Sequence, residues 1–149
     1  LRMILLKSVR EDAGAAYSVS ASCGISYEQE YTRASLSMQA PISDPSKIEL
    51  SEKLMHEAIS NFGKPSDTSG VDFADAVGKT KANMLKNYEM SLKTNRQWVG
   101  ALTILLRQGV DKFTDYKSTL ESVTPEKVRE FVETIVAGGN HIRIVMIPE

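Results

Sequence analysis

The sequence predicts an α+β fold in which an antiparallel sheet is covered on one face by helices. Two observations point to this class. Residues 16–39 hold two runs in which apolar and polar side chains alternate, the pattern of half-buried strands. Most of the other residues carry apolar side chains at helical spacing, between residues that start or end helices. A strand pair with one apolar face needs a cover, and helices can supply it.

The chain is expected to open with a helix over residues 1–12. Leu1, Ile4 and Leu5 recur at helical spacing, and Gly14 can adopt the backbone conformation that ends a helix. No capping residue precedes this helix, and the sequence does not begin with Met. We therefore expect the chain to be a piece of a longer polypeptide.

Two strands, over residues 16–23 and 31–39, are expected to form a hairpin. Alternation places one set of side chains of the first strand on a single face: Tyr17, Val19, Ala21 and Cys23. The corresponding face of the second strand holds Thr32, Ala34, Leu36 and Met38. Because Cys23 belongs to this apolar face and has no basic neighbour in sequence, we expect its thiol to be buried and unreactive.

Five helices and a last strand complete the predicted order. The expected helices span 45–62, 71–92, 95–108, 111–121 and 125–137. Two of them begin with a capping residue followed by proline, at Asp44–Pro45 and Thr124–Pro125. The final strand is expected over residues 141–147. We expect the helices over 45–62, 71–92 and 95–108 to cover the sheet.

Composition excludes several classes of function. A chain of 149 residues with a net charge of −1 suits one domain and has no electrostatic reason to bind nucleic acid. No apolar run approaches the roughly 20 residues of a membrane span. The single cysteine excludes an internal disulfide and leaves the compartment open.

Neither a metal site nor a nucleotide site is complete in the sequence. His56 and Glu57 match part of a zinc-peptidase helix, but Ser60 stands where the second histidine is needed. The other histidine, His141, is far along the chain. The Gly-Lys-Thr at residues 78–80 lies inside a predicted helix, so its backbone amides are not free to bind phosphate. We expect no metal ligands in this chain.

Arg10 and Tyr17 flank the junction between the first helix and the first strand. Their spacing fits a solvated arginine at a helix end and a half-buried strand tyrosine. It also fits two side chains that donate hydrogen bonds to a ligand carbonyl. Alternation places Tyr17 with the apolar residues, although its hydroxyl group would still need a partner. Spacing alone leaves both interpretations open.

The stretch LRMILLKSVREDAGAAYSVSAS resembles a segment of the pitrilysin/insulinase-type zinc metallopeptidases. In that family a helix ending in Arg-Glu is followed by Gly and Tyr and then by a serine-rich strand. FADAVGKTKANML and VTPEKVREFVETIV resemble later helices of the family and occur in the same order. The resemblance extends into the terminal strand and covers essentially the whole chain.

The resemblance implies that residues 1–149 are one α/β module, the C-terminal and zinc-free part of a longer zinc metalloendopeptidase. Zinc would be bound by a His-x-x-Glu-His motif in another module or a partner subunit, and the substrate would be an extended peptide. Arg10 and Tyr17 would bind substrate carbonyls, with Tyr17 as the catalytic group beside the developing oxyanion. The chain alone is expected to be inactive.

Two alternatives remain. One is a non-catalytic assembly subunit of the same fold, like the core subunits of a respiratory-chain complex. The other is a generic peptide-binding α+β domain. A pair corresponding to Arg10 and Tyr17 favours the peptidase, because a scaffold has no need of it.

Overall fold

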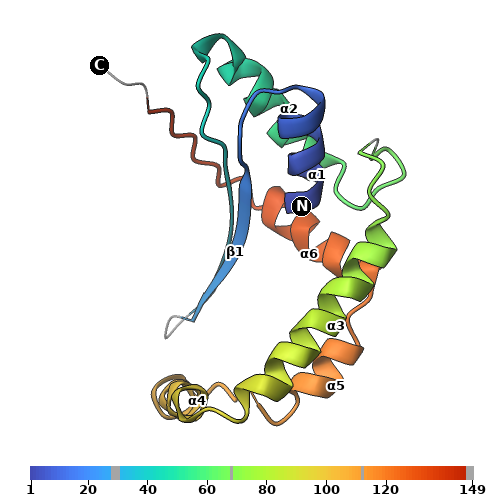
Figure 1. The fold of residues 1–149 in the computed structure, drawn as a ribbon. Helices are drawn as coiled ribbons and strands as arrows, with labels where there is room; N and C mark the ends of the chain where they lie inside the picture. Colours follow the sequence, from blue (N-terminus) through green and yellow to red (C-terminus); the bar gives the residue numbers. More distant parts are fainter. Residues whose placement is uncertain (28–30, 68, 112, 147–149) are drawn as a thin grey trace.

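A long antiparallel hairpin runs along one side of a set of helices in the computed structural model (Figure 1). The structure describes residues 1–27, 31–67, 69–111 and 113–146. Helices and one two-stranded antiparallel sheet are the regular elements of these ranges. The α+β class expected from the sequence is therefore confirmed.

The hairpin consists of β1 (Ser20–Tyr27) and β2 (Thr32–Gln39), with Ser20 opposite Gln39. The prediction of a hairpin is confirmed, but the first strand spans Ser20–Tyr27 rather than residues 16–23, so it both begins and ends four residues later than predicted. Pairing ends at Gln39 because β2 is followed by Ala40 and then Pro41, which has no N–H group to donate to a ladder.

The prediction that Cys23 is buried is wrong, because its side chain is exposed. β2 turns Leu36 and Met38 partly toward the core, as alternation predicts. On β1, Ala21 packs against the core near the start of the strand, whereas Cys23 and Ile25 farther along are exposed. Alternation assigns a residue to a face of the sheet, but the helices cover that face for only part of its length.

The first helix changes its geometry after one turn. α1 (Arg2–Leu5) continues into η1 (Leu6–Asp12), a π-helix. The Ala13 N–H group donates to the Ser8 carbonyl, five residues earlier, at 3.1 Å. Gly14, with φ of +54°, then leaves the helix, as predicted.

The remaining helices lie in the predicted segments, and except for α5 their ends change by only a few residues. They are η2 (Pro45–Lys47), α2 (Ile48–Ser60), α3 (Phe73–Ser91), α4 (Asn95–Gln108), α5 (Tyr116–Glu121) and α6 (Pro125–Ala137). Asp44 accepts from the Ser46 N–H group at 3.0 Å, and Thr124 accepts from the Lys127 N–H group at 3.3 Å, so both predicted caps are formed.

The helix predicted over residues 111–121 starts later, at Tyr116. The Asp111 carboxylate accepts the N–H groups of Phe113 and Thr114, at 2.7 and 3.1 Å, and this closes a turn before the helix. Hydrogen bonding to the carboxylate also lowers the Asp111 pKa, the largest contribution coming from the Thr114 hydroxyl group.

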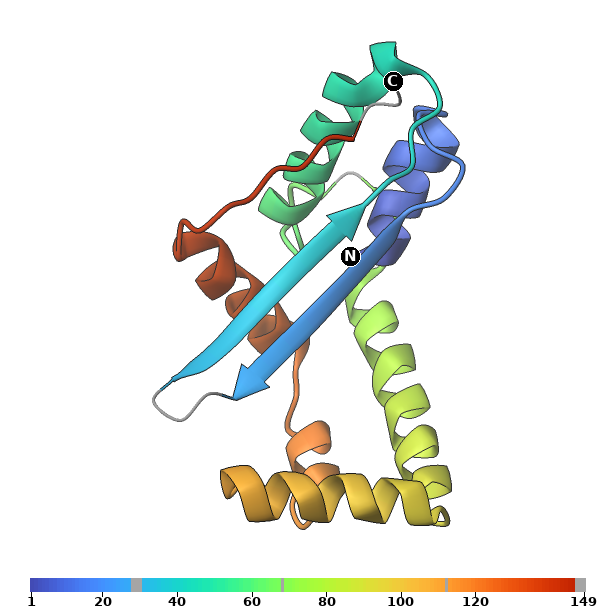
Figure 2. The ribbon, with the colours of Figure 1, turned by 90° about the vertical axis from the view of Figure 1, so that its left-hand side faces the viewer.

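The predicted final strand is wrong over residues 141–146, which pair with no strand of the described chain. This segment runs beside α2 (Figure 2). The Arg143 Nε donates to a Glu52 carboxylate oxygen at 2.8 Å, and the His141 ring contacts the His56 ring. Side chains of α2 hold the segment instead of a sheet edge; residue 147 lies outside the described residues.

The buried apolar core is concentrated near the N-terminal helix. Its members come from α1, η1, the junction that follows, α2, the turn after α2, and α6: Ile4, Leu5, Val9, Ala15, Ala16, Val19, Ala58, Phe62 and Val132.

The covering helices differ from those expected. α1 packs against β1 and α6 against β2, and the prediction that the helices over 45–62, 71–92 and 95–108 cover the sheet is wrong in naming neither of them. α2, within the predicted segment 45–62, does share the buried core with the hairpin. α3 leads away from the core, and α4 lies across the end of α3 that is farthest from the core (Figures 1 and 2). Periodicity reveals that a helix has an apolar face but not which element will lie against it.

Candidate peptide-binding site at the helix–strand junction

The structure brings Arg10 and Tyr17 together. Arg10 lies in the last turn of η1, and Tyr17 lies in the connection that leads to β1. The guanidinium carbon of Arg10 is 5.5 Å from the centroid of the Tyr17 ring, within the range of a cation–π contact. Both side chains are exposed, Tyr17 to 83 %. They form a pair of donors on an open surface.

Buried residues on both sides hold this junction in place. Val9 is fully buried in η1, and Ala15, Ala16 and Val19 are buried in the connection. The Ala15 N–H group donates to the Val9 carbonyl at 2.9 Å, which ties the connection to the helix end. Arg10 and Tyr17 therefore each follow directly after a buried residue, Val9 and Ala16, which restrains the backbone at both positions.

A long-range contact also ties the junction to the next helical unit. The Lys47 ammonium group, in η2, donates to the Gly14 carbonyl at 2.9 Å. Gly14 is the residue at which the chain turns out of the helix. This contact joins parts of the chain that are 33 positions apart and restrains the turn between Arg10 and Tyr17.

The placement of Tyr17 with the apolar residues of the first strand is wrong. Tyr17 and Val19 should share a face by alternation, yet Val19 is only 4 % exposed. The chain bends at Tyr17 and pairs with β2 only from Ser20 onward. Of the two interpretations of Tyr17 from the sequence, the half-buried strand tyrosine is excluded.

The hydrogen-bonding groups of Arg10 and Tyr17 are available to a ligand as far as the described residues show. Within the ranges that the structure describes, neither the Arg10 guanidinium group nor the Tyr17 hydroxyl group has a hydrogen-bond or ion-pair partner. A guanidinium group offers five N–H donors, and a phenol offers one O–H donor. Together they can donate to neighbouring carbonyl oxygens of an extended peptide, or to an oxyanion that develops on one of them.

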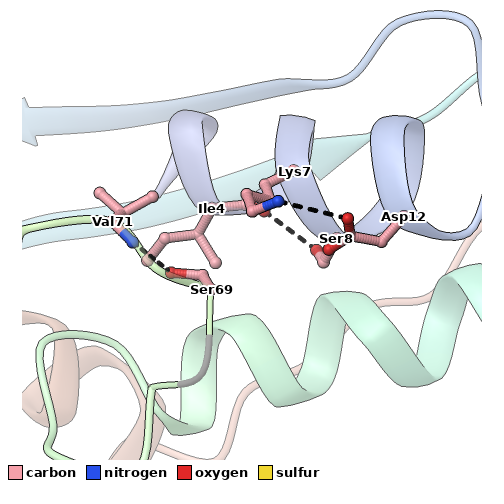
Figure 3. A network of polar contacts seen from close by, with 6 residues as sticks. All are labelled: Ile4, Lys7, Ser8, Asp12, Ser69 and Val71. Carbon is pink, nitrogen blue, oxygen red and sulfur yellow. Dashed lines mark hydrogen bonds and ion pairs between the residues drawn. The ribbon is translucent and has the colours of Figure 1, made fainter.

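A hollow of about 350 Å³ lies between the N-terminal helix, α2 and the loop that follows α2. Its polar lining includes three carboxylates, those of Asp12, Glu57 and Asp67. Figure 3 shows part of its wall, where Lys7 pairs with Asp12 at 3.3 Å and the Val71 N–H group donates to the Ser69 hydroxyl group.

This hollow is separate from the candidate pair, since neither Arg10 nor Tyr17 lines it. Its lining comes from two regions far apart in the sequence, residues 4–13 and residues 50–69, and no local motif marks either of them. The sequence therefore contains no local pattern that predicts this hollow.

The side chains that could bind a metal ion, those of His, Cys, Asp and Glu, do not form a cluster of three or more in the described part of the chain. His56 and His141 do meet, with ring centroids 5.0 Å apart, although the sequence separates them by most of the chain. The exposed Cys23 belongs to β1.

None of the helices in the described part of the chain is long and apolar enough to cross a lipid bilayer, which agrees with the expectation from the sequence. Comparisons with protein-family models, with curated proteins and with solved structures found no match.

Proposed function

We propose that this chain is the substrate-binding module of a pitrilysin/insulinase-like zinc metalloendopeptidase, the part that does not hold the catalytic zinc. Arg10 and Tyr17 bind an extended peptide there, in an active site whose zinc belongs to another module or to a partner subunit. The observation that carries the proposal is the exposed contact between these two side chains, whose hydrogen-bonding groups have no partner among the described residues. The resemblance of the surrounding sequence supplies the reaction class.

The two side chains have different tasks. The planar guanidinium group of Arg10 holds a substrate carbonyl and fixes the register of the peptide. The hydroxyl group of Tyr17 donates to the carbonyl oxygen of the scissile bond, on which negative charge grows in the transition state. The metal chemistry belongs to residues outside this chain, and this chain binds and orients the peptide.

The test uses the longer protein that contains this chain and its zinc-bearing part. Tyr17→Phe should lower kcat about 100- to 1,000-fold, the usual effect of removing one oxyanion donor. Zinc content should not change. Arg10→Ala should lower kcat/KM, and Arg10→Lys should restore it only in part, because an ammonium group cannot reproduce the guanidinium fork.

The chain offers a matched control in the hairpin. The Arg33 guanidinium carbon lies 5.7 Å from the centroid of the Tyr31 ring, so the same two residue types meet at a different place. This pair differs in one respect, because an Arg33 N–H group also donates to the Tyr31 hydroxyl group at 3.4 Å. Tyr31→Phe and Arg33→Ala should leave turnover unchanged. Equal turnover in Tyr17→Phe and Tyr31→Phe would contradict the proposal.

The other two candidate functions predict different results. In a non-catalytic assembly subunit, the longer protein would carry no His-x-x-Glu-His motif and would not cleave peptides at all. In a generic peptide-binding domain, this chain alone would bind extended peptides, and Tyr17→Phe would change affinity without any effect on a reaction.

A further inference from the structure

The two histidines of the chain meet on the surface, away from the candidate peptide-binding site. His56 lies on α2, and His141 lies at the start of the extended C-terminal segment, residues 141–146. Their ring centroids are 5.0 Å apart, and the ring planes are inclined by 77°. These are the two histidines of the sequence, so both imidazole rings of the protein take part in this contact.

This separation suits two imidazoles bound to one metal ion. With metal–nitrogen bonds of about 2.0–2.1 Å and a near-tetrahedral angle, two such rings have centres roughly 5 Å apart. The ring inclination does not oppose coordination, because each ring can turn about its own metal–nitrogen bond. Both side chains are exposed, so water can complete the coordination shell.

The C-terminal segment has little apolar attachment to α2. Of its apolar side chains, Ile142, Ile144 and Met146 are 84, 79 and 91 % exposed, and only Val145 is more than half covered, at 42 % exposed. The contacts that fasten the segment involve polar side chains at neighbouring points of α2, namely Arg143 on Glu52 and His141 on His56. Glu52 and His56 are one helical turn apart, so one face of α2 receives both contacts.

We propose that His56 and His141 form a two-histidine clasp, which binds a divalent transition-metal ion such as Zn²⁺ or Ni²⁺ and fastens the C-terminal segment to α2. Imidazole nitrogen is a ligand that suits these ions. Two protein ligands make the binding reversible and distinguish the clasp from a catalytic zinc site, which typically has three.

Calorimetric titration of the whole chain tests the clasp. Cys23→Ser serves as the background, because the exposed thiol is a competing ligand. Zn²⁺ and Ni²⁺ should bind with one equivalent, whereas Mg²⁺, which prefers oxygen ligands, should not bind. His56→Gln and His141→Gln should each weaken Zn²⁺ binding at least tenfold. Glu57→Gln, next to His56, is the matched control and should keep the affinity.

Tryptic cleavage after Arg143 tests the second half of the proposal. Zn²⁺ should slow this cleavage in the background protein and have no effect in His141→Gln. Cleavage after Arg33, in the hairpin, should proceed at one rate with and without metal and corrects for any effect on trypsin itself.

Three results would overturn the clasp: full affinity in either histidine variant, two independent equivalents of metal, or cleavage after Arg143 that ignores Zn²⁺. None of them bears on Arg10 or Tyr17, so the clasp and the proposed function fail separately. Conversely, zinc that survives dialysis and supports peptide cleavage by this chain alone would contradict the proposal that the catalytic zinc lies outside this chain.

Discussion

Tyr17 and Val19 show how two residues with the same place in a sequence pattern receive opposite environments. Alternation assigns both to one face, but Tyr17 is exposed and Val19 is buried. A strand needs a paired neighbour to hold its pleat, and the residues before Ser20 have none. The position of each side chain there depends on how the connection packs onto the helix.

This difference predicts the stability of two variants of the isolated chain. Tyr17→Phe should change the free energy of unfolding by no more than about 0.5 kcal/mol, because the Tyr17 side chain is exposed and its hydroxyl group bonds to none of the described residues. Leu5→Ala should lower it by about 2–5 kcal/mol, because Leu5 is fully buried in the core. Urea unfolding of both variants measures the two effects, and a large loss in Tyr17→Phe would mean that the tyrosine has a structural role.

At the scale of elements, two glycines have opposite requirements. Gly63, after α2, has φ of +66°, and a Cβ atom there would lie 2.7 Å from Cε1 of Phe73. The Phe73 ring packs edge-on against the core residue Phe62, with centroids 5.0 Å apart. Gly78 lies inside α3, and a Cβ atom there would meet nothing within 4 Å.

Alanine substitution should therefore act in opposite directions at these positions. Gly63→Ala should destabilise the protein, through a strained backbone and the displaced Phe73 ring. Gly78→Ala should stabilise it by roughly 0.5–1 kcal/mol, the usual gain of alanine over glycine within a helix. Thermal unfolding of the pair is a direct comparison, and a gain in stability in Gly63→Ala would show that the close approach to Phe73 is not maintained.

At the scale of the whole molecule, buried residues are distributed unevenly. The core lies among the N-terminal helix, α2 and α6, whereas α3 and α4 contain no buried residue in the described chain. The distant end is held by an aromatic cluster. There Tyr88 stacks on Tyr116 with centroids 4.4 Å apart, and Trp98 stacks on Phe113 with centroids 5.0 Å apart.

This distribution predicts two levels of local stability. Backbone amides of α4 should exchange with deuterium through openings of lower free energy than those of α2, because fewer apolar contacts must be broken. Hydrogen exchange at increasing urea concentrations would measure both. One common opening energy for the two helices would contradict the prediction and would indicate a single cooperative unit.

The sequence by itself determined the features that depend on neighbouring residues. Asp44 and Thr124 cap their helices, Gly14 ends the first helix, and the alternating runs form the hairpin, because these choices are made within a few positions of chain.

Only the tertiary structure decided the rest. It selected α1 and α6 as the cover of the hairpin, placed residues 141–146 on α2 instead of in the sheet, and joined His56 to His141. Arg10 and Tyr17 were named from the sequence, but their contact and exposure required the packed junction. Long-range contacts depend on which surfaces bury the most apolar area together, and no local pattern contains that comparison.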